Sequence, residues 1–180
     1  MVVAEAPTTP APFPFEAPEP DRLATGGLAI ICYSGDLEKT WAALILASTA
    51  GAMAMPAKVF VTFWGLQIFV RDDRRITGEL DAADDVVHAA PGISHRKLSK
   101  MNFLGMGPWM MGRLAKQYGV ASPKELLEAA QAMGVEFIPC QMTMDMFGLK
   151  REDLIEGMGE PVGAATYLSF VAEGAHPLFI

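Results

Sequence analysis

Cys140 is the residue whose type and position in this sequence are best suited to chemistry. It directly follows the run 135–139 (VEFIP), which is typical of a strand, and precedes polar and flexible residues that can form a helical turn. A thiol in the first turn of a helix faces the amide dipoles, which stabilise a thiolate or another anionic sulfur species. A purely structural cysteine at a strand end is the alternative, and the position favours a reactive thiol.

The second cysteine, Cys32, has a different setting. It lies inside the apolar run 28–34 (LAIICYS), which predicts a core position for its side chain. A resolving role is the less favoured alternative, since Cys32 lies near its own strand end. Two cysteines so far apart do not indicate a disulfide framework, so a secreted, disulfide-stapled domain is not expected.

Other familiar site patterns do not occur in the sequence. His88, His95 and His176 show no metal-ligand spacing with each other or with the cysteines, so no metal is expected. The first predicted strand is not followed by a Gly-x-Gly-x-x-Gly turn, and no cofactor is expected. A thiol peroxidase would need Thr or Ser three residues before the thiol, where this chain has Phe137, so that alternative is weak.

The elements that must position Cys140 follow an α/β pattern. Strands are expected at 28–34, 58–63, 135–139 and 178–180, with a brief extended piece at 160–162. Helices are expected at 36–55, 66–71, 122–133, 150–156 and 162–173. Strands that alternate with helices indicate a parallel sheet with helices on both faces, a three-layer α/β/α architecture. Reactive groups in such sheets lie beyond the carboxyl ends of the strands.

The predicted helix 36–55 is apolar on nearly all sides and needs more cover than a sheet provides. A second protomer or a folded-back segment must cover its other side, so a homo-oligomer is expected, with 162–173 as a second contact helix. Residues 40–57 carry no charge, but their Ala, Ser, Thr and Gly content and Pro56 indicate a buried helix. Peripheral membrane contact is kept as the minority alternative.

Outside these elements, two segments stand apart. Residues 1–25 form a Pro-rich tail that predicts disorder and shows no secretory signal, and residues 26–180 are expected to form a single, soluble, cytoplasmic domain. Residues 72–117 form a long insertion after the second strand. The formal charge of −7 argues against nucleic acid as a partner, yet the span 86–124 contains six basic residues and no carboxylate.

Several runs of the sequence resemble the DsrE/DsrF-like sulfur-relay family. They are IICYSGDLEKTWAALILASTAGAMAM, KVFVTFWGLQIF, LSKMNFLGMGPWMMGRL and FIPCQMTMDMFGLKREDLIEGM. The match is closest to the long-insertion branch, often labelled a peroxiredoxin family, and covers about 28–180. Its most specific part is Cys-x-Met-x-Met-Asp-x-x-Gly at 140–148, with Ser-Gly-Asp at 34–36 and Phe-Trp-Gly at 63–65.

The resemblance implies a five-stranded parallel sheet between helix layers, a homo-oligomer, and a cysteine that carries sulfur as a persulfide. That cysteine corresponds to Cys140. It would take sulfane sulfur from a rhodanese-type donor and pass it to a TusA-like carrier. The residues expected to line the site are Ser34, Asp36, Trp64, Gly65, Lys100, Met106, Met142 and Met144.

Sulfur transfer requires a thiolate that attacks a sulfane sulfur and later gives up the outer sulfur atom. The Met-, Phe- and Trp-rich part of the insertion could shield a persulfide, and its basic residues could attract an acidic carrier. The alternative function is a non-catalytic oligomeric subunit or binding module of a sulfur-metabolism complex, because some relatives lack thiol activity.

Overall fold

The computed structural model of the chain describes residues 26–71 and 106–180. The expected tail 1–25 and the part of the expected insertion from 72 to 105, which includes Lys100, lie outside the described residues. The remainder of the insertion is a helix.

The sheet consists of four parallel strands in the order β3-β2-β1-β4. They are β1 (Leu28–Cys32), β2 (Ala57–Val61), β3 (Glu136–Pro139) and β4 (His176–Phe179). Cys32 pairs with Val61, and Val61 pairs with Pro139 on its other side, so β1, β2 and β3 end level with one another. The α/β fold with a parallel sheet is confirmed, and its carboxyl edge collects the ends of three neighbouring strands.

The expected five-stranded sheet is wrong, because the described part of the chain has four strands. The extended piece near residues 158–162 does lie beside β3, through isolated parallel bridges of Met158 to Phe137 and of Val162 to Cys140. Pro161 lies in this segment and has no amide hydrogen to donate. A continuous ladder therefore cannot form there, and the segment is an irregular cover of the β3 edge rather than a strand.

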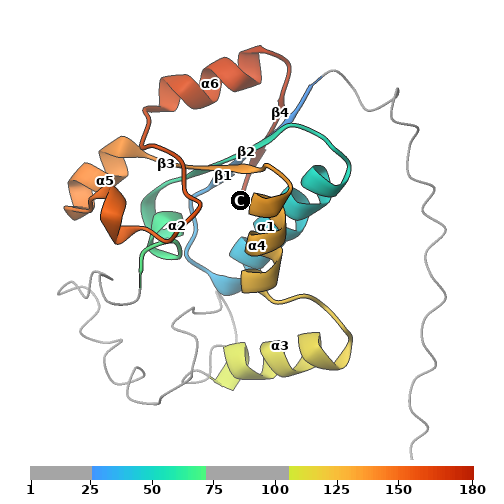
Figure 1. Cartoon of the computed structure of the whole chain (residues 1–180). Helices are drawn as coiled ribbons and strands as arrows, with labels where there is room; N and C mark the ends of the chain where they lie inside the picture. Colours follow the sequence, from blue (N-terminus) through green and yellow to red (C-terminus); the bar gives the residue numbers. More distant parts are fainter. Residues whose placement is uncertain (1–25, 72–105) are drawn as a thin grey trace, which may run out of the picture.

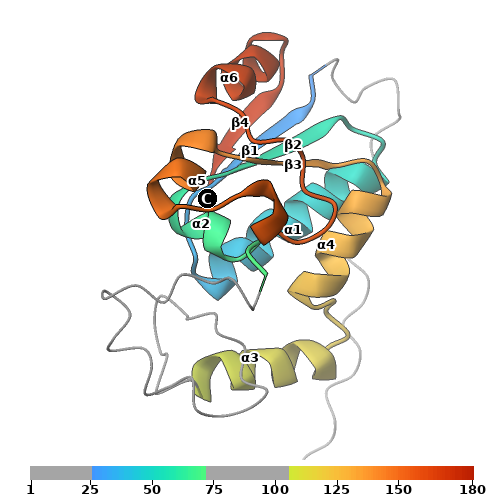
Figure 2. The ribbon, with the colours of Figure 1, turned by 60° about the vertical axis from the view of Figure 1, so that its left-hand side comes forward.

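Helices occupy both faces of the sheet and its carboxyl edge (Figures 1 and 2). Helices α1 and α4 lie on one face and α6 on the other, while α2 and α5 lie beyond the carboxyl ends of the strands. The elements are α1 (Leu37–Ala52), α2 (Phe63–Gln67), α3 (Met106–Gln117), α4 (Pro123–Ala132), α5 (Gln141–Phe147), the 3-10 turn η5 (Arg151–Asp153) and α6 (Ala164–Ala172).

Several helices differ from the sequence prediction. The expected helix 150–156 is wrong, since only the 3-10 turn η5 forms there, and residues 141–147, expected to form a helical turn, form the helix α5. Helix α3 lies where the Gly- and Met-rich run GMGPWMMG gave no periodic pattern. Phe63, expected as the last residue of a strand, instead begins α2. Helix α4 follows its sequence signature, since the Ser122 hydroxyl accepts a hydrogen bond from the Glu125 amide and the Glu125 carboxylate accepts one from the Ser122 amide.

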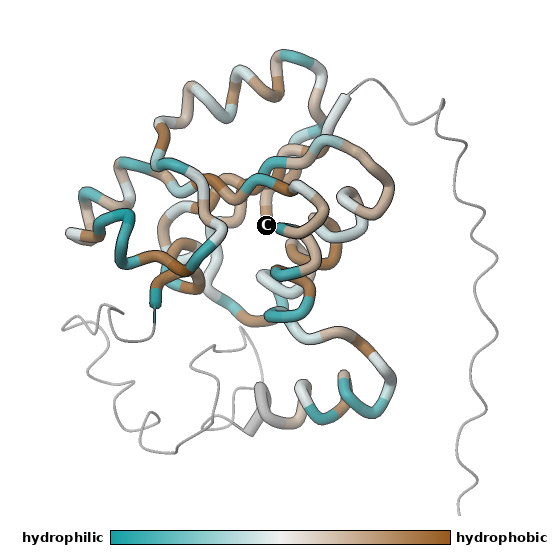
Figure 3. Tube along the Cα trace, in the orientation of Figure 1, coloured by the Kyte–Doolittle hydropathy of each residue, from teal (hydrophilic) through white to brown (hydrophobic). Residues whose placement is uncertain are grey.

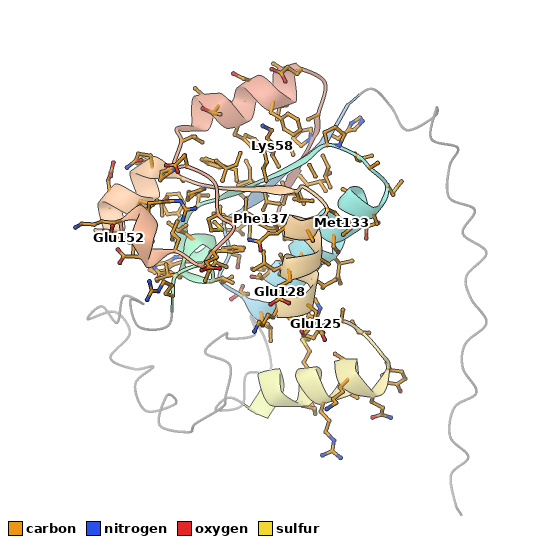
Figure 4. All side chains as sticks on the ribbon, viewed as in Figure 1. Lys58, Glu125, Glu128, Met133, Phe137 and Glu152 are labelled. Atoms are coloured by element: carbon orange, nitrogen blue, oxygen red, sulfur yellow. The ribbon has the colours of Figure 1, made fainter. Side chains whose placement is uncertain are left out.

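The two faces of the sheet contribute to separate hydrophobic clusters. One, between the sheet, α1 and α4, contains Cys32 and Phe137, and the other, beneath α6, contains Cys140 and Tyr167. Figure 4 shows Phe137 in the interior, and Figure 3 shows hydrophobic residues along the central strands. Alternate residues of each strand point to opposite faces, so strand position decides which cluster a side chain joins.

The long apolar helix α1 has its cover partly from within the chain. Helix α4 packs along it, and the Trp41 indole donates a hydrogen bond to the Ala121 carbonyl. The segment that contains Ala121 and α4 therefore folds back over α1 and buries part of its apolar surface. No helix within residues 26–71 and 106–180 is both long enough and apolar enough to cross a membrane.

Candidate functional site

Cys140 lies where β3 gives way to α5, with its backbone held on both sides. Its amide donates to the Val61 carbonyl at the end of β2 (2.9 Å), and its carbonyl accepts from the Met144 amide inside α5 (3.0 Å). Its neighbour Gln141 donates to the Val162 carbonyl (3.0 Å). The side chain is buried, with 4% of the residue exposed. The fold thus fixes the thiol at the carboxyl edge, as the sequence predicted.

Two threonine hydroxyls lie next to this thiol. Thr62, the last residue before α2, and Thr143, in the first turn of α5, bring their hydroxyl oxygens within 2.9 Å of each other. Both residues are buried, Thr143 almost completely at 1% exposed and Thr62 at 8%. A buried pair of hydroxyls joined by a hydrogen bond is a fixed polar element in an otherwise apolar interior.

The backbone of Phe63, which is strained, also contacts the Thr62–Thr143 pair. The Phe63 amide donates to the Thr143 hydroxyl oxygen (3.2 Å), and Phe63 has a φ of 46°, in the left-handed region that a non-glycine residue rarely adopts. Such conformations persist only where the surrounding structure enforces them, and they cluster at functional sites. Here the strained residue aims its amide at Thr143.

The environment of Cys140 acts on its pKa in two opposite directions. Burial raises the pKa, whereas donor groups directed at the sulfur lower it: the Thr143 hydroxyl and amide, the Thr62 hydroxyl and the Met142 amide. The donors outweigh burial, so the pKa of Cys140 lies below that of an ordinary cysteine. A lowered pKa enlarges the fraction of nucleophilic thiolate at neutral pH.

The expected site residues Trp64 and Gly65 directly follow Phe63 in α2. The Trp64 ring, 55% exposed, packs on Phe147 of α5 with 5.6 Å between ring centroids. The Gly65 amide donates to the Tyr33 carbonyl (2.9 Å), and a Cβ atom at Gly65 would lie 2.3 Å from the Cys32 carbonyl oxygen. Only glycine allows α2 to approach the end of β1 this closely.

Ser34 and Asp36 lie in the loop after β1, behind Trp64. The Ser34 hydroxyl accepts from the Asp36 amide (3.2 Å), and the Asp36 carboxylate binds the Lys39 ammonium (2.7 Å). A Cβ atom at Gly35 would lie 3.0 Å from the Trp64 carbonyl oxygen, so this loop packs directly on Trp64. Both residues therefore pack behind Trp64, and their polar contacts lie within the loop and with the first turn of α1.

The expected methionines are placed differently from one another. Met142 is exposed on the first turn of α5, next to the thiol, whereas Met144 is buried in the cluster on the opposite face of the sheet. Met106 begins α3, which lies well apart from α5 in both views (Figures 1 and 2). Met142 is thus the exposed methionine of α5 that lies two residues after Cys140.

Exposed apolar side chains continue along the carboxyl edge beyond Met142. We call them the apolar rim: Tyr33, Phe63, Trp64, Met142 and Phe179. Tyr33 follows β1, and Phe179 is the last residue of β4. Their rings stack with 4.6 Å between the centroids. Apolar groups gathered at the same edge as a reactive thiol are typical of a docking surface.

Cys32 is buried among apolar residues at the end of β1. Burial raises its pKa to about 11, so the thiol stays protonated and unreactive at neutral pH. The core position predicted from the sequence agrees with this placement. Within the described residues, no cluster of three or more His, Cys, Asp or Glu side chains could hold a metal ion.

Sequence reasoning missed Thr62 and Thr143. Thr143 is three residues after the candidate thiol, a position whose side chain can turn back toward the residue that begins the helix. Thr62 ends the run KVFVT, the strand that neighbours VEFIP in a parallel sheet. A search for hydroxyls both after the thiol and at the end of the adjacent strand would have found the pair.

Comparison with known proteins places the chain in a family. The profile of the DsrE/DsrF/DrsH-like family matches residues 25–179. The chain is 36% identical over 153 residues to the uncharacterized protein YrkE of Bacillus subtilis, covering 84% of this chain and 94% of YrkE. It is 34% identical over 163 residues to the sulfur carrier protein DsrE2 of Allochromatium vinosum, covering 85% of this chain and 97% of DsrE2.

A solved structure is also similar to this chain. The protein of unknown function MTH1491 from Methanobacterium thermoautotrophicum has a TM-score of 0.42 and 15% identity, over 85% of this chain and 99% of that one. The family match and the two relatives each span most of the sequence. The chain belongs to the DsrE/DsrF/DrsH-like family.

Proposed function

We propose that this protein is a sulfur carrier that accepts and donates sulfane sulfur as a persulfide on Cys140. The observation that carries the proposal is the thiol at the carboxyl edge, beside two buried hydroxyls, whose pKa is lowered against the effect of burial by donor groups that include those hydroxyls. A thiolate held in a confined site can attack a sulfane sulfur and shelter the product from other thiols.

The two transfers balance without an oxidant. In loading, the Cys140 thiolate attacks the outer sulfur of a donor persulfide or polysulfide; a new S–S bond forms, and the donor leaves with the electron pair of the bond that breaks. In unloading, an acceptor thiolate attacks the outer sulfur on Cys140, and the electron pair of that S–S bond returns to Cys140 as thiolate. The carried sulfur keeps its oxidation level throughout.

The relative named sulfur carrier protein DsrE2 supports this proposal, since it is similar over 85% of the chain. We further propose a rhodanese-type donor and a TusA-like carrier as partners, with the apolar rim as the surface on which a carrier docks. Aromatic and methionine side chains suit such a surface because they bury much area and adapt to a partner.

Intact-mass measurement after incubation with polysulfide, or with thiosulfate and a rhodanese, tests the proposal. Wild type and Cys32→Ala gain one sulfur atom that a reductant removes, whereas Cys140→Ser gains none. Retention of the adduct in Cys140→Ser would contradict the assignment.

A second candidate is a non-catalytic subunit or binding module, which the low exposure of Cys140 favours. Under that function neither wild type nor Cys32→Ala takes up sulfur under any of these conditions. Denatured protein serves as the control, since it exposes both thiols and shows that the donor is active.

A further inference from the structure

The Thr62–Thr143 pair leaves one hydroxyl proton that has no partner within the pair. Each threonine hydroxyl has one proton to donate and two lone pairs that accept. The 2.9 Å contact between the two oxygens uses one of the two protons, whichever threonine is the donor. One proton is therefore left to point elsewhere.

The surroundings restrict where this proton can go. Within residues 26–71 and 106–180, the two hydroxyls form hydrogen bonds with each other and with the Phe63 amide, which is a donor. The Phe63 amide occupies a lone pair of the Thr143 oxygen, and as a donor it cannot accept the remaining hydroxyl proton. Both residues are buried, so bulk solvent has little access to the two hydroxyls. The sulfur of Cys140 is an acceptor beside both hydroxyls, at the start of the helical turn that carries Thr143.

We propose that Thr62 and Thr143 are positioning residues that together direct one hydroxyl proton at the sulfur of Cys140, holding it as a thiolate. This inference rests on the proposed function for its biological use. The Phe63 amide fixes the orientation of the Thr143 hydroxyl by occupying one of its lone pairs, which explains the strained conformation at Phe63. The pKa of Cys140 is lowered by donor groups that include both threonine hydroxyls, and the proton count allows one of the two to donate to the sulfur at a time.

The same proton assists unloading. When an acceptor thiolate takes the outer sulfur, the S–S bond to Cys140 breaks and the electron pair returns to the Cys140 sulfur. A hydrogen-bond donor at that sulfur stabilises the departing thiolate, and a better leaving group speeds exchange. The pair therefore favours both the attacking thiolate before loading and the leaving thiolate during unloading.

The test is the pH dependence of Cys140 alkylation by iodoacetamide, measured on the full chain in a Cys32→Ala background. In Thr143→Val, and most strongly in the double Val variant, the midpoint of the rate profile moves to higher pH. The rate at neutral pH falls roughly tenfold, as expected for a lost hydrogen bond to a charged group. Thr62→Val has a smaller effect, because Thr143 can still donate. Thr143→Ser retains the hydroxyl and restores the wild-type midpoint.

Thr40→Val is the matched control. Thr40 is fully buried and donates its hydroxyl proton to the Asp36 carbonyl, in α1 and away from the thiol. Its loss destabilises the fold in a comparable way and leaves the midpoint unchanged. An unchanged midpoint in the double Val variant, or a Thr143→Ser midpoint equal to that of Thr143→Val, overturns the inference. If the double variant does not fold, the Thr143→Val and Thr143→Ser pair decides.

Alkylation requires no sulfur donor, so its outcome is independent of the proposed function. A shifted midpoint in a protein that never takes up sulfur rejects the sulfur carrier and leaves the role of the hydroxyls intact. Normal sulfur uptake with an unshifted midpoint supports the sulfur carrier and rejects the role of the hydroxyls. Release of the outer sulfur to a small thiol is the second readout, and it slows in the double Val variant.

Discussion

Cys32 and Cys140 lie on opposite faces of the sheet, with β2 between the strands that carry them. Two strand spacings place their Cα atoms on the order of 10 Å apart. A disulfide needs Cα atoms within about 7 Å and side chains that point toward each other. Cys32 therefore cannot act as a resolving thiol for Cys140 within one chain without a rearrangement of the sheet.

Oxidation with diamide tests this separation. The native chain forms no intramolecular disulfide, and non-reducing peptide mapping recovers Cys32 and Cys140 in separate, uncrosslinked peptides. Chain unfolded in urea, where the two thiols can meet, gives the crosslink and shows that the reagent is competent. A crosslink in the native protein would show that the strands separate in solution.

Stability at alkaline pH depends on Cys32. Below about pH 9 its thiol is protonated in both folded and unfolded chains, so it has no effect on the free energy of unfolding. Burial raises its folded pKa to about 11, so between about pH 9 and 11 the unfolded chain ionises first and stability falls. Urea denaturation across this range gives a decline on the order of 2 kcal/mol larger in wild type than in Cys32→Ala. Parallel declines in the two proteins contradict the prediction.

Gly65 controls the approach of α2 to the end of β1. In Gly65→Ala the new Cβ atom meets the Cys32 carbonyl oxygen, which must move, and overpacking of this kind costs about 1–3 kcal/mol. The shift also displaces Thr62 and slows sulfur loading. The control is Gly112→Ala in α3, where nothing lies within 4 Å of a Cβ atom and the helix gains up to about 1 kcal/mol. Urea denaturation measures the free energy of unfolding of both variants, which is expected to fall in Gly65→Ala and to rise in Gly112→Ala.

Trp64 belongs to the apolar rim and not to the polar group at the thiol. Trp64→Ala loses a partly exposed ring contact with Phe147, which costs about 1 kcal/mol. Loading from polysulfide stays at the wild-type rate, and transfer to a TusA-like carrier slows several-fold, roughly the effect of one interface aromatic. Met133→Ala, an exposed apolar site at the C-terminal end of α4 (Figure 4), leaves transfer unchanged. Equal transfer rates in both variants would remove the docking role.

Homo-oligomerisation is expected through the outer faces of α1 and α6. Ile45 and Leu46 of α1 and Leu168 of α6 are exposed in the single chain, and α6 buries Tyr167 on its sheet side. Light scattering at micromolar concentration gives a multimeric mass for wild type, and Ile45→Glu combined with Leu168→Glu reduces it. Ala129→Glu, on the exposed side of α4, keeps the wild-type mass. A monomeric wild type would contradict the expectation.

Local signals in the sequence were sufficient for the α/β class and for the position of Cys140. Short apolar runs predict buried strands, and the Ser122–Glu125 capping box marks the start of α4, because both depend on neighbouring residues alone. The extended piece at 160–162 was predicted, but not its failure to form a fifth strand, which Pro161 prevents because it has no amide hydrogen for the ladder. Helix α3 was not predicted, because its sequence lacks apolar periodicity.

The sequence by itself determined that Cys140 directly follows a strand and that Cys32 is enclosed in an apolar run, since each depends on adjacent residues. Only the tertiary structure decided what surrounds the Cys140 thiol. Thr62 and Thr143 are 81 residues apart, and they meet because parallel pairing brings the ends of β2 and β3 level. Hydrogen bonds act over about 3 Å, so strand register decides that the Thr62 hydroxyl joins the donors that lower the pKa of Cys140, and no local pattern encodes that register.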